Sequence, residues 1–337
     1  MKAYVLEAGS TSLDGLKRVE RPDPSHGPRE VLVRMRAASL NFRDQAVATG
    51  RYFGGPVRRD TVPLSDGAGE VLSIGDQVTR FKPGDRVAPT FFQGWIDGPF
   101  GPILDRALGS PLDGALAELA VFDQDGLVAI PPSLSFEEAA CLPCAALTAW
   151  HALMAHRPLR PGETVLALGT GGVAMFALQF AHAAGARVIV TSSSDDKIAR
   201  AKALGASDGI NYRTSPDWEK EVMKLTGGHG ADRVIELGGV GTFGRSVQAV
   251  AYGGEISLIG VLAPPGADTN LPVLMVKNAA ARGIFVGSRR MFEDMNRAIE
   301  INCIAPVIDR TFPFDAAADA FRHQMTGSHM GKIVITI

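Results

Sequence analysis

Residues 164–174 read TVLALGTGGVA, a short apolar run that leads directly into a cluster of glycines. Apolar residues then recur at helical spacing up to Gly185, and residues 187–191 form a second apolar run, RVIVT. Strand, glycine turn, helix and strand therefore follow one another within roughly 30 residues, the length of one βαβ unit. This arrangement predicts a dinucleotide-binding site. The alternative is a glycine turn that serves only the fold.

The glycines match the pattern G-x-G-x-x-G/A. Gly169 lets the chain turn, Gly171 lets the backbone approach a pyrophosphate, and Ala174 in the third position keeps the helix close to the sheet. Unpaired N–H groups and a partial positive charge at the helix start favour an anion there. The cofactor-binding residues predicted in this turn are Gly169, Thr170, Gly171, Gly172 and Val173.

The end of the second strand predicts which dinucleotide binds. Domains that prefer NAD place Asp or Glu about 20 residues after the glycine turn, to accept from the ribose 2′-OH. Here residues 192–194 are serines, and Asp195 and Asp196 come late enough to lie in the next helix's first turn. A 2′-phosphate therefore fits, with Ser192 and Ser193 as donors and Lys197 as counter-charge. We expect NADPH rather than NADH; the alternative is a helix N-cap and a solvent-facing lysine.

Length and composition bound the class of protein. The 337 residues suggest two domains, and a hydrophobic content of 46% is ample for their cores. Net charge is −2, which indicates neither a nucleic-acid footprint nor a polyanionic tail. No apolar run is long enough to span a membrane, the N-terminus does not resemble a signal peptide, and three cysteines argue against a disulfide framework. We expect a soluble cytoplasmic protein.

The pattern of elements predicts an α/β fold. Residues 1–128 carry strand signals cut by turns, while 129–285 alternate helices and strands, including strands near 233–237 and 255–259. Such alternation predicts a doubly wound parallel sheet. Residues 286–337 return to β character at KIVITI, so the second domain is expected to be inserted into the first. The aromatic loop 91–113 is a lid, surface packing or a subunit contact.

With these motifs assembled, the chain resembles a medium-chain dehydrogenase/reductase from end to end. The segment ASLNFRD at 38–44 and Tyr52 are similar to the nicotinamide pocket of the zinc-independent quinone oxidoreductases, the zeta-crystallin group. Further segments resemble the wider superfamily; they are LSDGAGEV (64–71), FKPGDRV (81–87), LPCAALTA (142–149) and GTGGV (169–173). The resemblance implies a Rossmann domain inserted in a discontinuous GroES-like β domain.

The resemblance also bears on metal binding. A catalytic zinc needs three protein ligands, and the zinc-dependent relatives carry Cys where this chain has Asn41 and His where it has Ser65. Only Cys144 matches a ligand position. Residues 91–113 contain no cysteine, so the structural zinc lobe is also missing. We expect no metal, with Cys144 a small buried residue; the alternative for Cys141 and Cys144 is a redox pair.

Without a metal, the substrate must delocalise negative charge itself, as quinones and α,β-unsaturated carbonyls do. By resemblance, Asn41, Tyr52 and Thr148 are the hydrogen-bond donors expected to line the acceptor site. Their alternatives are a turn residue, a packed aromatic ring and a hydroxyl bonded to its own helix. The resemblance also assigns Tyr212 to the 2′-phosphate, and Gly260, Val261, Phe285 and Val286 to the nicotinamide side.

Three functions compete. The first is zinc-free, NADPH-dependent reduction of a quinone or activated alkene, the second an alcohol dehydrogenase acting on a simple carbonyl or alcohol, and the third non-catalytic NADPH binding. By analogy the chain is expected to form a homodimer, through the last strand of each Rossmann sheet.

Overall fold

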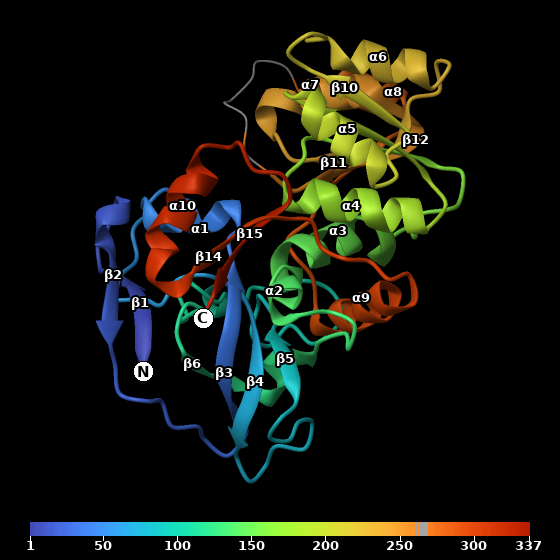
Figure 1. Ribbon diagram of the computed structural model, residues 1–337. Coiled ribbons are helices and arrows are strands. Elements are labelled where there is room, and N and C mark those ends of the chain that lie inside the picture. The colour runs from blue at the N-terminus through green and yellow to red at the C-terminus, as the bar shows by residue number, and fades with distance from the viewer. Residues whose placement is uncertain (261, 263–268) are drawn as a thin grey trace. The chain divides into compact units, whose positions relative to one another are not determined.

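The computed structural model describes residues 1–260, 262 and 269–337 (Figure 1). By its contacts the chain divides into two compact units, a first unit of Met1–Leu147 with Val286–Ile337 and a second unit of Thr148–Phe285. Residues 129–147, which the sequence analysis grouped with the inserted domain, pack with the first unit. The chain thus leaves the first unit once and returns to it.

The first unit is mainly β-structure. Its strands are β1 (Lys2–Leu6), β2 (Leu16–Glu20), β3 (Glu30–Ser39), β4 (Asp66–Ile74), β5 (Arg86–Pro89), β6 (Leu119–Asp123), β7 (Leu127–Ala129), β14 (Ile308–Pro313) and β15 (Lys332–Thr336). Its helices are α1 (Phe42–Ala48), α2 (Phe136–Ala139), α9 (Arg289–Ile301) and α10 (Ala317–Met325), with a π-helical turn at Leu142–Ala146 that contains Pro143.

The last strand of the chain completes the sheet of the first unit. The sheet order is β14-β15-β3-β4-β5-β7, with β6 beside β3. β15 lies antiparallel to β3, with Val334 opposite Ser39, so the C-terminal segment is hydrogen-bonded to the strand that leads into α1. This pairing brings the start of β15 next to residues 40 and 41, which matters for the site described below.

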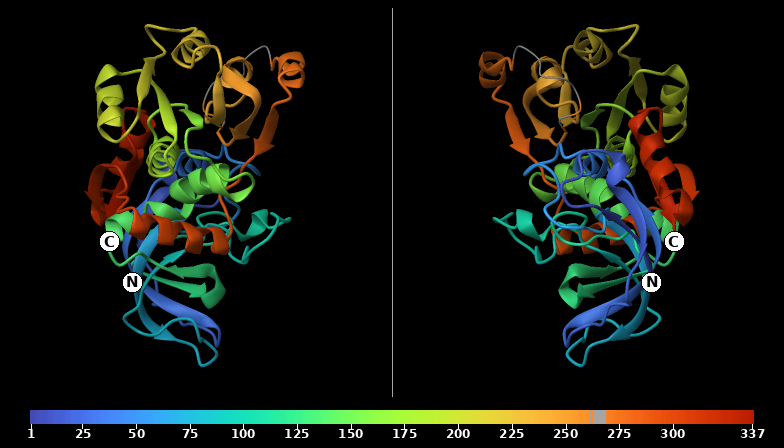
Figure 2. Two further views of the ribbon diagram at one scale, coloured as in Figure 1. Left: turned by 90° about the vertical axis from the view of Figure 1, so that its right-hand side faces the viewer. Right: turned by 90° about the vertical axis from the view of Figure 1, so that its left-hand side faces the viewer.

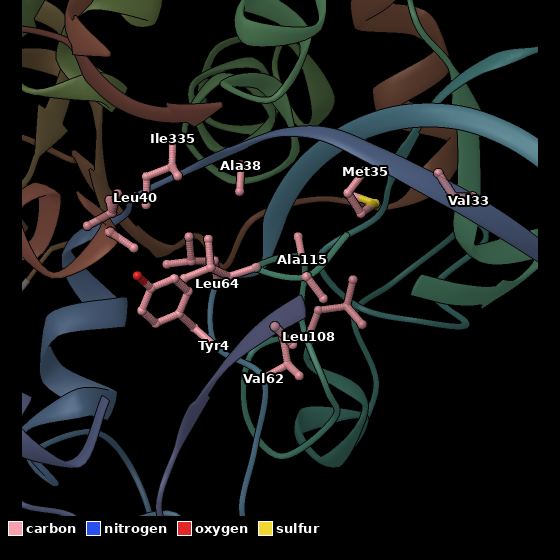
Figure 3. Close-up of a cluster of buried hydrophobic side chains, with 14 of the residues drawn as sticks. Tyr4, Val33, Met35, Ala38, Leu40, Val62, Leu64, Leu108, Ala115 and Ile335 are labelled. Carbon is pink, nitrogen blue, oxygen red and sulfur yellow. The ribbon is translucent and has the colours of Figure 1, made fainter. Parts of the chain in front are cut away.

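A hydrophobic core holds this sheet to the loops around it. Side chains from β1, β3 and β15 meet those of the segments before β4 and after β5, as Figure 3 shows for Tyr4, Met35, Leu64 and Leu108. Leu64 is buried with φ at +70°, a strained conformation for a residue with a Cβ. Its carbonyl accepts from the N–H of Ala115, and this contact helps hold the strained residue directly before Ser65.

The second unit alternates strands and helices. Its strands are β8 (Thr164–Ala167), β9 (Arg187–Ser192), β10 (Asp208–Asn211), β11 (Ala231–Glu236), β12 (Val250–Leu258) and β13 (Ala280–Gly283). Its helices are α4 (Gly172–Ala183), α5 (Asp195–Ala203), α6 (Trp218–Leu225), α7 (Val240–Ala249) and α8 (Leu271–Val276), while α3 (Leu147–Trp150) begins at the division between the units and runs into a π-helical turn at His151–Ala155.

The six strands form a parallel sheet in the order β10-β9-β8-β11-β12-β13. Crossovers between parallel strands are right-handed. α4 and α5 lead from β8 toward β10 and lie on one face of the sheet, whereas α6 and α7 lead in the opposite direction, from β10 toward β12, and lie on the other face (Figure 2). Trp218, Phe243 and Val247 of these two helices pack on the apolar residues of that face. The order reverses between β8 and β11, so a ligand crevice is expected outside the carboxyl ends of these strands. The predicted α/β fold is confirmed.

The aromatic loop 91–113 carries its own small core. Phe91, Phe92 and Trp95 are almost fully buried, and the rings of Phe92 and Trp95 both contact Phe100, at centroid distances of 5.1 and 4.9 Å. The loop is therefore anchored by ring packing. Separately, none of the helices in the described part of the chain has the length and apolarity that crossing a bilayer requires.

Candidate functional site

The glycine turn lies between β8 and α4. Gly169 has φ at +85°, which only glycine adopts readily, and its N–H donates to Thr191 Oγ1 at 3.0 Å. Gly171 is the N-cap of α4, with no side chain capping the helix, so the first N–H groups of α4 have no intrahelical acceptor. A Cβ added at Gly169 or Gly171 would meet no described atom within 4 Å.

These features fit a pyrophosphate. The open space at the two glycines has the donors of Gly172 and Val173 beside it, at the positive end of a helix of 12 residues. Thr170 is buried in the turn. The turn therefore has both the room and the donors that a dinucleotide requires, and it lies at the carboxyl end of β8 as predicted.

The residues predicted for the 2′-phosphate gather around the end of β9. Ser192 is buried, and its Oγ accepts from the N–H of Ser194, which in turn caps α5 through a hydrogen bond from the N–H of Lys197. Tyr212 follows β10 and donates its N–H to the Ser192 carbonyl at 3.0 Å, with its side chain 42% exposed. Ser193 and Lys197 are partly exposed.

No carboxylate stands at positions 191–194, and the nearest acid is already engaged. Asp195 Oδ1 accepts from Asn211 Nδ2 at 2.9 Å, which ties the start of α5 to the end of β10. The N-cap alternative is thus realised by Ser194, while Ser193, Lys197 and Tyr212 remain exposed enough to reach a ligand.

Of the four residues predicted for the nicotinamide side, the structure describes three. Gly260 follows β12, donates its N–H to the Glu236 carbonyl, and has no room for a side chain, since a Cβ would lie 2.0 Å from the Leu237 carbonyl oxygen. Val261 lies outside the described residues. Phe285 is partly buried at the end of the second unit, and Val286 begins the last part of the first unit with φ at +54°.

Sequence analysis missed one residue at this edge of the sheet. Glu236 ends β11 fully buried, and its carboxylate accepts from the N–H groups of Gly238 and Gly239 at 2.8 and 3.0 Å and from Thr242 Oγ1 at 2.5 Å. The carboxylate fixes the turn that faces the switch point beside β8. An acid at a strand end followed by two glycines was the signal available in the sequence.

The acceptor-site candidates of the first unit centre on Asn41, the N-cap of α1. Its side chain is only 9% exposed, and its Nδ2 lies 3.5 Å from Ser65 Oγ. Ser65 donates to Asp66 Oδ1 at 2.8 Å, and Asp66 Oδ2 accepts from the N–H of Cys144 at 3.3 Å. Asn41, Ser65 and Cys144, the three positions compared above with zinc ligands, are therefore joined in one network.

A buried lysine, also missed by the sequence analysis, completes this network. The ammonium of Lys332, at the start of β15, donates to Asn41 Oδ1 and to the Leu40 carbonyl, both at 2.6 Å, and lies 3.5 Å from Asp66 Oδ2. Lys332 is 3% exposed and Asp66 is fully buried. The KIVITI pattern predicted only a strand, because the sequence does not show which loop the first residue of that strand meets.

Tyr52 belongs to the same neighbourhood through Arg43. The Arg43 guanidinium lies between the rings of Tyr52 and Phe91, 5.0 and 4.7 Å from their centroids, and donates to the Leu108 carbonyl at 2.8 Å. Burial raises the pKa of Tyr52, so its hydroxyl stays protonated and can donate a hydrogen bond. Arg43 thus joins α1, Tyr52 and the aromatic loop.

A carboxyl group and two thiols near the network have raised pKa values. Burial raises the pKa of Asp44 to about 6, against the opposing effects of Arg43 and of the Asn41 N–H, which donates to its Oδ2 at 2.7 Å. Burial also raises the pKa of Cys141 to about 12, and it raises the pKa of Cys144, a partly buried residue. Both thiols are therefore protonated near neutral pH, which disfavours a redox pair.

Thr148 is buried in α3 and is the first residue of the second unit. The structure thus brings Asn41 together with Ser65, Cys144 and Lys332, and Tyr52 together with Arg43. The residues predicted to bind the cofactor in the second unit lie at or follow the carboxyl ends of its parallel strands and so share one edge of the sheet. No group of three or more His, Cys, Asp or Glu side chains within residues 1–260, 262 and 269–337 is arranged to hold a metal ion.

Comparison with known proteins gives a consistent family. Residues 27–132 match the alcohol dehydrogenase GroES-like domain, and residues 172–301 match the zinc-binding dehydrogenase family. A zinc-type alcohol dehydrogenase-like protein of Schizosaccharomyces pombe is 45% identical over 99% of both chains. A quinone oxidoreductase of Pseudomonas aeruginosa is 36% identical over 75% of this chain and 71% of its own.

A solved NAD-dependent alcohol dehydrogenase superposes with a TM-score of 0.91 at 34% identity, with full coverage of both chains. Full-length similarity in sequence and fold, together with the glycine turn and the parallel sheet, agrees with the resemblance found in the sequence. The chain belongs to the medium-chain dehydrogenase/reductase superfamily and is an oxidoreductase of the alcohol dehydrogenase-like kind.

Proposed function

We propose that the protein is a zinc-free, NADPH-dependent reductase of quinones or α,β-unsaturated carbonyls. The observation that carries the proposal is the buried Lys332 ammonium, which lies 2.6 Å from Asn41 Oδ1. It is close to the positions at which zinc-dependent relatives carry their zinc ligands. A divalent cation bound between Asn41, Ser65 and Cys144 would meet this positive charge at close range. An amide and a hydroxyl are also poor zinc ligands compared with thiolate and imidazole.

The chemistry follows from what these side chains can do. NADPH supplies a hydride when it is bound, and the substrate carbon that accepts it leaves negative charge on a conjugated oxygen. Asn41 Nδ2 and the protonated Tyr52 hydroxyl are the donors that would stabilise this oxygen. The oxygen then takes a proton from solvent, so that one hydride and one proton reduce the acceptor by two electrons.

The preference for NADPH rests on the end of β9. Positions 191–194 hold no carboxylate to repel a 2′-phosphate, and the nearest one, that of Asp195, is held by Asn211. Ser193, Lys197 and Tyr212, all at least partly exposed, are the donors that would contact the 2′-phosphate. The P. aeruginosa relative named as a quinone oxidoreductase supports the acceptor class.

An alcohol dehydrogenase reaction is the second candidate. The S. pombe relative, 45% identical, is named as zinc-type alcohol dehydrogenase-like, and residues 172–301 match the zinc-binding dehydrogenase family. A reaction of this kind would need the oxygen of a plain aldehyde or ketone to be polarised without a metal at Asn41 and Ser65.

We also propose that the protein is a homodimer. β13 ends the parallel sheet, and all four of its residues are exposed. The helix that precedes β13 in the chain, α8, exposes Leu271, Met275 and Val276. An exposed strand edge next to apolar side chains is suited to pairing with the same edge of a second copy.

No disulfide joins any of the cysteines, all of which are in the described residues, and this supports a cytoplasmic location.

The test compares oxidation of NADPH and NADH with 1,4-benzoquinone, a 2-alkenal and a simple aldehyde, using protein whose zinc content has been measured. NADPH consumption with the quinone or alkenal, by protein that contains no zinc, is the expected result. Turnover of the simple aldehyde alone, lost on chelation, would establish the alcohol dehydrogenase reaction instead. Tight NADPH binding with no turnover would contradict both.

A further inference from the structure

We propose that Lys332 is a positioning residue for catalysis, whose ammonium fixes and polarises the Asn41 amide so that Nδ2 donates to the substrate oxygen. The proposal rests on the proposed reductase function, because it assigns Asn41 the role of the donor that meets the developing negative charge. Lys332 itself acts through Asn41 and makes no contact with substrate.

The hydrogen bonds determine the orientation of the amide. Lys332 can only donate, and its Nζ lies 2.6 Å from Asn41 Oδ1, so a flipped amide would place two donors against each other. On the other side, the Ser65 hydroxyl donates to Asp66 Oδ1 at 2.8 Å, which leaves Ser65 Oγ to accept from Asn41 Nδ2. Both neighbours therefore select the same orientation.

The orientation leaves one donor for a ligand. Asn41 Nδ2 carries two hydrogens, and the acceptor found for them in the described part of the chain is Ser65 Oγ, at the long distance of 3.5 Å. Asn41 keeps 9% of its surface exposed, and the proposal directs the second hydrogen of Nδ2 to a substrate oxygen there. A donor held in advance costs no reorganisation when charge develops.

The charge on Lys332 also strengthens that donor. A cation bonded to an amide oxygen draws electron density from the nitrogen and makes its N–H groups more polar. Burial of Lys332 at 3% exposure keeps water from screening the effect. Asp66, 3.5 Å from the ammonium, balances part of its charge but accepts its hydrogen bonds from Ser65 and the Cys144 N–H, so it does not displace Asn41 Oδ1 as the acceptor of the ammonium.

The fixed position of Lys332 follows from the backbone. Its second hydrogen bond goes to the carbonyl of Leu40, the residue directly before Asn41, and β15 is itself paired with β3 through Val334 and Ser39. The ammonium is therefore held by both the backbone and the side chain of one short segment, residues 40 and 41. This rigidity is what a positioning residue requires.

The first experiment compares Lys332→Met, Lys332→Arg and the control Lys277→Met. Lys277 is also buried and donates to two carbonyls, those of Gln248 and Val250, but it lies in the second unit. Lys332→Met should lower kcat for the quinone by roughly 10- to 100-fold, less than the loss of a whole oxyanion donor, with the KM for NADPH within about twofold. Lys332→Arg should recover part of kcat. Lys277→Met should lower Tm alone.

A second comparison shows whether Lys332 acts through Asn41. In an Asn41→Leu background the donor is already absent, so Lys332→Met should cost less than about twofold in kcat. Equal losses in both backgrounds, or a loss explained by Tm in the same way as that of Lys277→Met, would overturn the proposal while leaving the reductase function intact.

A spectroscopic readout tests the same contact whether or not the protein turns over an acceptor. With selective ¹⁵N labelling of asparagine, the side-chain amide signal that disappears in Asn41→Asp is that of Asn41. Lys332→Met should move this signal upfield and slow its base-catalysed hydrogen exchange, because the amide loses its cation. An unchanged signal would overturn the inference independently of any failure of the proposed reaction.

Discussion

The N–H of Gly169 donates a hydrogen bond to Thr191 Oγ1 at 3.0 Å, which ties the glycine turn after β8 to the end of β9. These two segments carry the residues expected to hold two phosphate groups of one cofactor, the pyrophosphate at the turn and the 2′-phosphate beyond Thr191. The hydrogen bond fixes the spacing between the two groups of donors before any ligand binds.

Gly171→Ala should separate cofactor binding from folding. Gly171 has φ at −77°, which alanine adopts without strain, and the added Cβ would meet no described atom within 4 Å. The fold should therefore keep its Tm, whereas the methyl group would enter the space expected for the pyrophosphate. We expect NADPH affinity, measured by fluorescence titration, to fall by more than about tenfold, or 1.4 kcal/mol.

Gly169→Ala is the matched control, because Gly169 has φ at +85° and alanine there should lower stability by about 1 kcal/mol. If Gly171→Ala bound NADPH like the wild-type protein, the glycine turn would serve only the fold.

Lys197→Ala should weaken NADPH binding but not NADH binding. Lys197 is partly exposed in the first turn of α5, whose N-cap Ser194 follows the end of β9. A single charge contact of this kind contributes about 1 kcal/mol, so the Kd for NADPH should rise roughly fivefold. The measurement is calorimetric titration of both dinucleotides. Lys202→Ala, at the exposed far end of the same helix, should change neither. Equal losses for the two dinucleotides would assign Lys197 to the helix alone.

The parts of the fold that could be predicted are those with local signals. Ser135 and Glu138 form the capping box that their spacing predicts, with hydrogen bonds in both directions, and Pro143 interrupts the helix that follows. The glycine turn and the strands near 233 and 255 also follow from sequence patterns. The sixth strand, β13, was missed because its residues, AARG, are small or charged and show no strand alternation.

The acceptor site depends on contacts between distant parts of the chain. Asn41 and Ser65 could be singled out by resemblance, but Lys332, the partner of Asn41, lies 291 positions after Asn41. Only the antiparallel pairing of β15 with β3 brings the ammonium to Asn41. Glu236 is similar, since its four acceptor contacts depend on how the turn after β11 folds back. Composition and periodicity carry no information on such contacts.

Asp44→Asn should change how stability depends on pH. Burial raises the folded-state pKa of Asp44 from the ordinary 3.8 to about 6. Because the folded-state pKa is the higher one, the stability that Asp44 contributes is fully present below about pH 3.8 and is lost as the pH rises through about 6. Asparagine cannot ionise, and its side-chain oxygen can still accept from the Asn41 N–H. The free energy of unfolding of the variant relative to wild type should therefore increase from pH 4.5 to 7.5, by about 2 kcal/mol.

Urea unfolding at several pH values measures this difference. Asp105→Asn removes an exposed carboxylate and should give a curve parallel to that of the wild-type protein. Parallel curves for Asp44→Asn as well would show that Asp44 ionises in the folded state as readily as in the unfolded chain.

Met275→Glu should convert the proposed dimer into a monomer. Met275 is 75% exposed on α8, the helix that precedes the edge strand β13 in the chain, so in the proposed dimer its side chain would be buried against the second copy. An uncompensated carboxylate placed there would cost several kcal/mol at the interface. The molar mass from light scattering should fall to that of one chain of 35.6 kDa, with an unchanged fold by circular dichroism. Ile301→Glu is the control, because Ile301 is equally apolar and 80% exposed but belongs to α9 of the first unit. A wild-type protein that is already a monomer, or a dimer that both variants leave intact, would show that this edge does not pair with a second copy.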